Sequence, residues 1–291
     1  MSMKVLVTGA AGLLGARLVG EFVRRGAVVV AGIHKNPAPA GRSGWDGVST
    51  TVFSDHDLSP LASTLAGGGF THLVHPAAIR SPEDCREDPD QAYRVNAALV
   101  EKMAVLAEEN QVKLVYFSTD YIFPGDLPPY PEDNPTRPLN VYGRSKLAGE
   151  VAARSAKQHL VARIPALWSL DPEETRSPLA VFLDKLRAGK PFPVDNILVR
   201  HYTLAEDIAQ ALVFLQEKEV SGVINLSAGE NQTKADFVRA IARHYRLDPG
   251  LVVDSQLPEG GEARPFDASL ECSRYLALNG PKLRGVSEVL L

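Results

Sequence analysis

The sequence predicts a doubly wound, parallel α/β sheet with a smaller C-terminal region. Three observations lead to this fold class. Short apolar runs alternate with helical stretches, a glycine-rich turn follows the first run, and the alternation loosens after about residue 165. Apolar runs of this kind are typical of strands buried on both faces of a parallel sheet. We therefore divide the chain into residues 1–165 and 166–291, with excursions of the second part back to the sheet.

The elements can be followed in order along the chain. Apolar runs at residues 4–8 and 28–33 flank a helix in which Leu14, Leu18 and Phe22 recur at every fourth position. Such a strand–helix–strand unit requires a parallel sheet. Later strands are expected at residues 50–53, 73–75, 114–117, 159–164 and 223–226, and later helices at 90–110, 142–156, 177–189, 204–218 and 233–246.

The composition excludes several classes of partner. The 291 residues carry 31 Lys and Arg against 35 Asp and Glu, a formal net charge of −4. A chain without a basic excess binds the nucleic-acid backbone poorly, and no apolar run reaches the roughly 18 residues that span a bilayer. We expect neither nucleic acid nor a membrane as partner. The two cysteines, Cys85 and Cys272, indicate a cytoplasmic location, and no metal-ligand spacing is present.

A glycine triplet follows the first predicted strand. Gly9, Gly12 and Gly15 form Gly-x-x-Gly-x-x-Gly and lead directly into the first predicted helix. Glycine lets the backbone approach a pyrophosphate, and the helix N-terminus offers free N–H groups and a partial positive charge. The context predicts a dinucleotide-binding domain of the Rossmann type over residues 1–165.

The end of the second strand bears on which dinucleotide is bound. Domains that bind NAD usually place an acidic residue there, where it binds the ribose 2′-hydroxyl. Here the strand leads into His34 and Lys35 instead. A basic residue favours a 2′-phosphate, so we expect NADP, with NAD as the open alternative.

A tyrosine and a lysine are paired on a predicted helix. Tyr142 and Lys146 are four residues apart, so they share one face of that helix. A nearby ammonium group would lower the pKa of the phenol, which could then transfer protons near neutral pH. Thr119 ends the strand before this helix, where a hydroxyl can bind a substrate carbonyl.

These motifs resemble those of the extended short-chain dehydrogenase/reductases. The resemblance is strongest to the branch typified by dTDP-4-dehydrorhamnose reductase, which includes the regulatory β subunits of methionine adenosyltransferase. It spans nearly the whole chain. The matching segments are residues 7–15, 57–58, 75–78, 96, 118–123, 129–130, 140–150, 163–165, 264–265 and 270–273.

The resemblance implies a role for each matching residue. Tyr142 would donate a proton to a ketone, Lys146 would hold the nicotinamide ribose and lower the pKa of Tyr142, and Thr119 would bind the carbonyl oxygen. The cofactor residues would be Gly9, Ala11, Gly12, Leu13, Leu14, Gly15, His34, Lys35, Asp57, Leu58, Ala77, Ala78, Tyr142, Lys146 and Ile164. The substrate residues would be Arg80, Asp120, Tyr121, Phe123, Arg200 and Arg264.

The implied activity is that of an NADP-preferring oxidoreductase that transfers hydride to a keto group of a nucleotide-linked sugar. Tyr121 stands where nucleotide-sugar dehydratases have glutamate, which favours simple reduction. Two alternatives stay open: a non-catalytic, NADP-binding regulatory subunit like the methionine adenosyltransferase β subunit, and a nucleotide-sugar epimerase. Analogy with the family allows a homodimer.

One loop is unusually rich in proline. Between Thr119 and Tyr142 lie Pro124, Pro128, Pro129, Pro131, Pro135 and Pro138. A loop of this length in a compact domain usually has a function, and we expect it to lie over the substrate.

Overall fold

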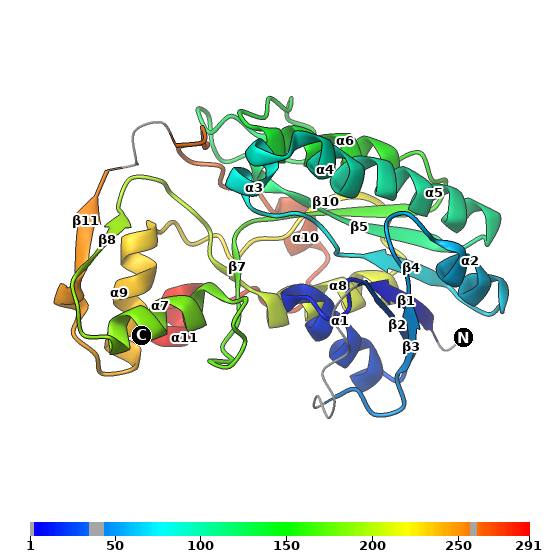
Figure 1. Ribbon diagram of the computed structural model, residues 1–291, viewed down its shortest axis with the longest axis horizontal. Coiled ribbons are helices and arrows are strands. Elements are labelled where there is room, and N and C mark those ends of the chain that lie inside the picture. The colour runs from blue at the N-terminus through cyan, green and yellow to red at the C-terminus, as the bar shows by residue number, and fades with distance from the viewer. Residues whose placement is uncertain (1–2, 35–43, 257–260) are drawn as a thin grey trace.

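The predicted parallel sheet is confirmed in the computed structural model, which describes residues 3–34, 44–256 and 261–291 (Figure 1). Seven parallel strands follow the order β10-β6-β5-β4-β1-β2-β3. Their bounds are β1 Lys4–Thr8, β2 Val28–Ile33, β3 Ser49–Val52, β4 His72–His75, β5 Lys113–Thr119, β6 His159–Ile164 and β10 Gly222–Asn225. Each was expected from its apolar run to within two residues.

Helices cover both faces of this sheet. On one face α1, Leu13–Arg24, packs against α8, Ala205–Glu217, over the buried side of β1, β5 and β6. On the other face lie α2, Ser59–Ala66, α5, Leu99–Glu109, and α6, Val141–Ala153. The second part of the chain therefore returns to the sheet through both α8 and β10. The division at residue 165 stays a proposal.

A smaller lobe follows β6 and lies beside the carboxyl ends of the strands (Figure 1). Its core joins Trp168, Tyr202 and Phe237, whose rings contact one another in a buried cluster. The lobe contains β7 Leu167–Trp168, α7 Pro178–Arg187, β8 Phe192–Asp195, β9 Thr203–Leu204, α9 Lys234–His244, β11 Val252–Ser255 and α11 Val286–Leu290. Two of these helices, α7 and α9, were expected and α11 was not; the strands, two to four residues long, carry too little periodicity to be predicted.

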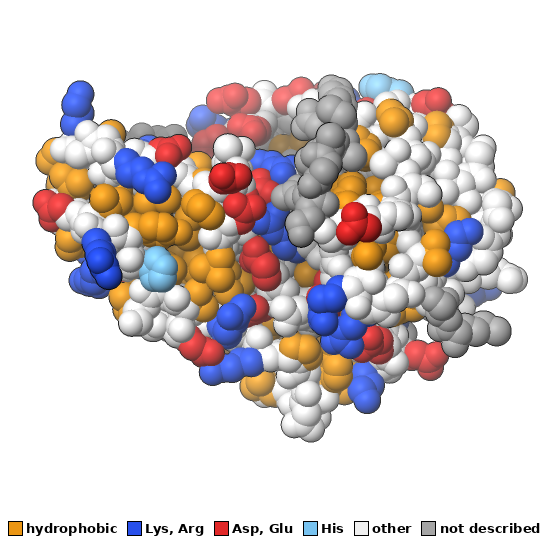
Figure 2. Space-filling view, turned by 90° about the horizontal axis from the view of Figure 1, so that it is seen from below, with side chains coloured by type: hydrophobic (Ala, Val, Ile, Leu, Met, Phe, Trp, Pro, Cys, Tyr) orange, Lys and Arg blue, Asp and Glu red, His pale blue; other side chains and the backbone are white. Residues whose placement is uncertain are grey.

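The outer face of this lobe is notably apolar. Figure 2, seen from below, shows hydrophobic side chains gathered over the smaller lobe. Val181 on α7 is 46% exposed and Leu291 at the C-terminus is 69% exposed. In the described part of the chain, no helix is long and apolar enough to cross a membrane.

An arginine joins the two lobes. Arg17 projects from α1, and its guanidinium donates hydrogen bonds to Glu174 Oε2 at 2.8 Å, Ser169 Oγ at 2.7 Å and Glu206 Oε1 at 3.1 Å. Glu174 is almost completely buried. Charge-assisted hydrogen bonds of this kind are stronger than neutral ones, so Arg17 fixes the segment after β7 against the first helix of the sheet.

Close packing sets the depth of α6 on the sheet. A Cβ at Gly149 would lie 2.0 Å from the backbone oxygen of Asn96 and 2.5 Å from Tyr116 Oη. Asn96 belongs to a π-helical turn, Arg94–Ala98, between α4, Pro89–Tyr93, and α5. Its side chain accepts a bond from the N–H of Ile79 and donates to Ser145 Oγ on α6. Because Gly149 has no side chain, the helix reaches this turn.

Substitution of Gly149 tests this packing. Gly149→Ala should lower the free energy of unfolding by roughly 1–3 kcal/mol, because the added methyl group overpacks a backbone contact. Gly20→Ala is the matched control: it lies within α1, a Cβ there meets no atom within 4 Å, and the higher helix propensity of alanine should add up to about 1 kcal/mol. Urea unfolding measures both. Equal effects of the two substitutions would contradict the packing argument.

Candidate active site

A cavity of about 820 Å³ lies where the strands of the sheet end and the smaller lobe begins. Ligands of open α/β sheets bind at this edge, and the volume is that of a typical ligand site. Most of the predicted site residues line it. They are Gly9, Ala11, Gly12, Leu13, Leu14, Gly15, His34, Ala77, Ala78, Arg80, Thr119, Asp120, Tyr121, Tyr142, Lys146, Ile164, Arg200 and Arg264.

The glycine turn has the geometry of an anion cradle. Gly9 has φ of +57°, and a Cβ at Gly15 would come within 2.1 Å of the Gly9 carbonyl oxygen. The N-terminus of α1 has no side-chain cap and no acidic residue in its first turn. The N–H groups that begin this helix are thus free to bind an anion. The turn fits the pyrophosphate of a dinucleotide.

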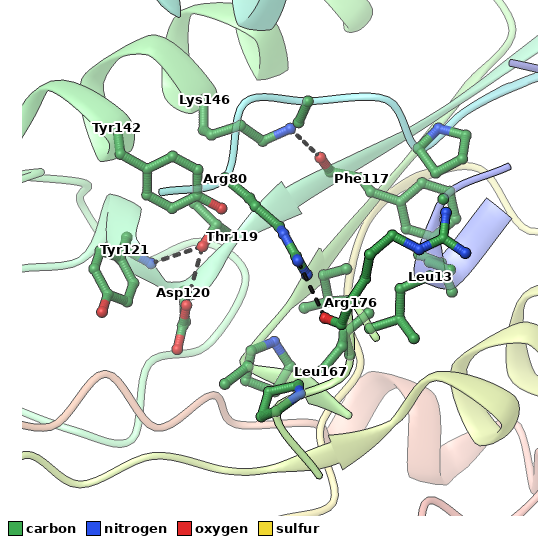
Figure 3. Close-up of a pocket in the computed structure, with 18 of the residues that line it drawn as sticks. Leu13, Arg80, Phe117, Thr119, Asp120, Tyr121, Tyr142, Lys146, Leu167 and Arg176 are labelled. Atoms are coloured by element: carbon green, nitrogen blue, oxygen red, sulfur yellow. Dashed lines mark hydrogen bonds between the residues drawn. The ribbon is translucent and has the colours of Figure 1, made fainter. Parts of the chain in front are cut away.

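Thr119, Asp120 and Tyr142 meet at the end of β5 (Figure 3). The hydroxyl of Thr119 donates to Asp120 Oδ1 at 3.0 Å and accepts the N–H of Tyr121 at 3.3 Å. The Tyr142 side chain lies beside Thr119, which lowers the pKa of the phenol. Three polar side chains thus come together at this end of the strand.

Lys146 lies one turn along α6 from Tyr142, with both side chains in the cavity wall (Figure 3). Its ammonium donates to the Phe117 carbonyl at 2.6 Å and lies 4.2 Å from the centre of the Tyr116 ring. Burial lowers the pKa of Lys146 to about 7. The pKa of Tyr142 is not lowered overall as the pairing with Lys146 predicted: burial raises it, and Thr119 acts in the opposite direction.

Burial also shifts the pKa of the Asp120 carboxyl group. It raises the pKa of Asp120 to about 6, although the positive charge of Arg200 and the bond from Thr119 act in the opposite direction. Arg200 reaches this part of the cavity over the Tyr121 ring, 5.2 Å from its centre. Tyr121 in turn contacts Tyr142 edge-on, with 5.5 Å between ring centres.

Of the residues expected near the adenosine of the cofactor, only some line the cavity. His34 lines the cavity, and Lys35 lies outside the described residues. Asp57 and Leu58 do not line the cavity. The Asp57 carboxylate instead accepts the N–H and hydroxyl of Ser59, at 2.9 and 2.6 Å, and so begins α2.

The acidic residue closest to His34 comes from another strand. Asp55, just after β3, has its Oδ1 3.3 Å from His34 Nε2 and its Oδ2 3.4 Å from Arg94 Nε. Asp55 could not be predicted as a neighbour of His34 from the sequence. The two residues are 21 positions apart, and only the pairing of β2 with β3 brings them together. A histidine and an arginine therefore share this carboxylate beside the cavity.

Phe123 and the prolines of the proline-rich loop lie outside the cavity. Phe123 is completely buried, stacks on Tyr130 with 4.5 Å between ring centres, and packs with Leu270. The expected role of Phe123 in substrate binding is therefore wrong. None of the six loop prolines lines the cavity, and the backbone of Tyr130 pairs with the segment around Leu270. The loop packs on the C-terminal segment, so it does not cover the site as expected.

The smaller lobe adds residues that no motif indicated. They are Arg176, Pro178, Phe182, Asp195, Leu198, Tyr202 and Lys234. Arg80, from the loop after β4, donates to the Arg176 carbonyl at 3.1 Å across the cavity (Figure 3). These positions come together only when the lobe folds over the sheet edge. In the part of the chain that the structure describes, no cluster of three or more His, Cys, Asp or Glu could hold a metal ion.

A comparison with family models identifies the chain. The model described as the RmlD substrate binding domain matches residues 3–290. The chain belongs to this family. The match spans both lobes of the RmlD-family fold, the sheet and the smaller lobe alike.

Individual relatives agree with this assignment. Methionine adenosyltransferase 2 subunit beta of Danio rerio is 32% identical, with 93% of this chain and 83% of that protein covered. The dTDP-4-dehydrorhamnose reductase of Salmonella typhimurium is 30% identical, with 94% and 91% covered. Both kinds of protein were named by the sequence resemblance, which is thereby confirmed.

Solved structures share the fold of this RmlD-family chain. The dTDP-4-dehydrorhamnose reductase of Bacillus anthracis in complex with NADP has a TM-score of 0.83 at 21% identity, covering 100% of this chain and 98% of that one. WbmG of Bordetella bronchiseptica in complex with NAD has a TM-score of 0.80 at 26% identity, covering 98% and 90%.

The raised pKa of Asp120 predicts how stability depends on pH. Between about pH 4 and pH 6 the unfolded carboxyl is ionised while the folded one keeps its proton. The free energy of unfolding should therefore fall as pH rises through this window, by an amount on the order of 3 kcal/mol. Asp120→Asn lacks this group, so the stability difference between variant and wild type should grow over the same window. Urea unfolding at a series of pH values measures it, and a constant difference would contradict the assignment.

Proposed function

We propose that this RmlD-family protein is an NADP-preferring reductase that transfers hydride to a keto group of a nucleotide-linked sugar. One observation carries the proposal: Tyr142, Thr119 and Asp120 line the same cavity as the glycine turn. A proton donor, an oxygen-binding hydroxyl and a dinucleotide cradle in one cavity are what carbonyl reduction requires.

The residues of the chain would act on the carbonyl oxygen. When bound, NADPH would supply the hydride that adds to the carbonyl carbon. The oxygen then becomes an alkoxide, which is a much stronger base than a phenolate. Tyr142 can therefore give up its proton to it even though burial raises the pKa of the phenol. Thr119 would hold the same oxygen by turning its hydroxyl proton from Asp120 to the substrate.

Lys146 and Asp120 would support this transfer. The bond from Lys146 to the Phe117 carbonyl holds the ammonium beneath the cavity floor, where it can position the ribose of a dinucleotide. A cation in this wall also favours the negative charge that Tyr142 acquires when it loses its proton. Asp120 accepts the hydroxyl of Thr119, which fixes the Thr119 side chain at the end of β5.

The preference for NADP rests on the end of β2. No acidic residue follows β2 directly, and a related fold is known in complex with NADP. Asp55 beside His34 would disfavour a 2′-phosphate, whereas Arg94 on the same carboxylate would favour it. A similar structure holds NAD, so NAD is kept as the alternative cofactor.

A regulatory role is the second candidate, because methionine adenosyltransferase 2 subunit beta of several animals is 27–32% identical to this chain. A regulatory subunit would bind NADP without turnover and would co-purify with a partner enzyme. An epimerase, the third candidate, would form product without net oxidation of the cofactor. A cytoplasmic location and a homodimer stay predictions from the sequence.

Tyr142→Phe tests the proposed chemistry. It should lower the rate of NADPH oxidation with 4-keto nucleotide sugars by about 10²- to 10⁴-fold, because general-acid catalysis is lost, while NADPH still binds. The exposed Tyr93 provides the matched control. Tyr93→Phe should leave both the rate of NADPH oxidation and NADPH binding unchanged. Nicotinamide absorbance follows turnover, and fluorescence follows NADPH binding. A fully active Tyr142→Phe protein would refute the proposal. Absence of turnover in the wild type, with NADPH bound, would favour the regulatory role.

A further inference from the structure

The role proposed for Lys146 requires a charged ammonium group, yet this side chain is only 4% exposed. Burial lowers the pKa of Lys146 to about 7, so the amine loses its proton close to neutral pH. An ammonium group taken out of water stays charged only where its surroundings compensate for the lost hydration. The charge of Lys146 therefore depends on the groups that surround it.

The titratable side chains nearest to Lys146 are uncharged near neutral pH. His75, at the end of β4, is close enough to be affected by the charge of Lys146, and burial lowers the pKa of this imidazole to about 3. Cys85 favours the ammonium only as a thiolate, and burial raises its pKa to about 11. Tyr142 shares the cavity wall, and burial raises its pKa above the usual range. None of these three groups neutralises the ammonium.

One carboxylate, that of Glu150, lies one turn farther along α6 and favours the charge of Lys146. The guanidinium of Arg163 donates to its two oxygens, at 2.6 and 3.1 Å. A buried pair of this kind largely cancels the negative charge of the carboxylate. Among the residues that the structure describes, Lys146 itself forms no ion pair.

Two consecutive residues of β5 hold the ammonium instead. Nζ donates to the Phe117 carbonyl at 2.6 Å and lies over the face of the Tyr116 ring, 4.2 Å from its centre. The face of an aromatic ring carries a partial negative charge, and it attracts a cation most strongly where water is excluded. The Tyr116 ring is completely buried, so the contact with Lys146 is made under these conditions.

The fold fixes the position of the Tyr116 ring. Its hydroxyl oxygen lies 3.2 Å from the Lys146 carbonyl and 3.4 Å from the Asn96 carbonyl, so one phenolic proton is shared between α6 and the π-helical turn. Gly149 leaves room for this oxygen, because a Cβ there would lie 2.5 Å from it. Burial raises the pKa of Tyr116, so the ring itself stays uncharged. All the contacts that place the ring under the ammonium come from the protein.

We propose that Tyr116 is a positioning residue whose ring keeps Lys146 protonated and holds its ammonium in the cavity wall. The inference rests on the proposed function only for the use of this charge in reduction, because the effect of the ring on the amine belongs to the protein alone. The ring face stabilises the charge, and the hydroxyl orients the ring. Phenylalanine keeps the face and leucine removes it, so the two parts can be separated.

The pKa of Lys146, measured without turnover, tests this role. It can be followed by the Cε chemical shift in protein that contains isotope-labelled lysine, with the signal assigned from Lys146→Met. Tyr116→Leu should lower this pKa by roughly one unit, the scale of a buried cation–π contact, whereas Tyr116→Phe should change it little. Fluorinated phenylalanines at the same position keep the shape of the ring but weaken the charge on its face, so the pKa should fall with each added fluorine.

Phe22→Leu is the matched control. Phe22 is as completely buried as Tyr116 but packs on the opposite face of the sheet, so its loss should destabilise the fold without changing the pKa of Lys146.

The affinity for NADPH gives a second readout. Wild type and Tyr116→Leu should bind NADPH similarly near about pH 5, where Lys146 is charged in both. Their affinities should diverge as pH rises through the two pKa values, to about tenfold above pH 7, because a pKa lowered by one unit leaves one tenth of the amine charged.

The outcomes separate this inference from the proposed function. A Lys146 pKa that is the same in wild type, in Tyr116→Leu and across the fluorinated series would overturn the role of Tyr116. Equal shifts in Tyr116→Leu and Phe22→Leu would also overturn it, because they would indicate a general loosening of the core. A ring-dependent pKa in a protein without reductase activity would support the role of Tyr116 and contradict the proposed reduction.

Discussion

The site depends on how closely α6 packs against β5 and the π-helical turn. Gly149 brings the helix onto the Asn96 carbonyl, and the Asn96 side chain joins the loop after β4 to Ser145. Buried polar groups of this kind are stable only when their bonds are complete. This one contact holds the helix that carries Tyr142 and Lys146 at a constant depth over the strand that carries Thr119.

The cavity takes polar groups from both lobes. The sheet lobe provides the uncapped N-terminus of α1 beside the glycine turn, and the smaller lobe provides Arg200, Lys234 and Arg264. Arg17 connects them through Glu174 and Ser169. Because both side chains of the Arg17–Glu174 pair are largely buried, salt screens this pair less than surface pairs. Arg17 is thus one of the contacts that hold the segment after β7 against the first helix of the sheet.

Sequence predictions were more accurate for features that depend on neighbouring residues than for features that depend on contacts between distant segments. The Tyr142–Lys146 pair and the glycine turn, predicted as catalytic and cofactor-binding, line one cavity, and each motif depends on a few neighbouring residues in one helix or turn. Phe123 was misplaced, because its burial depends on Tyr130 and on Leu270 from the far end of the chain. The pKa of Tyr142 was misjudged for a related reason: the helix places Lys146 nearby, but burial in the folded molecule outweighs that charge.

The sequence alone determined the order of the sheet strands along the chain and the Rossmann-type turn, and it named the residues proposed to carry the chemistry, because periodicity and short motifs act over a few residues. The tertiary structure decided which residues from distant segments line the same cavity. It brought Asp55 to His34 across two strands, moved the proline-rich loop away from the site, and set Lys234 and Tyr202 beside Arg200. These outcomes depend on packing between segments far apart in the chain, and no local pattern encodes which surfaces meet.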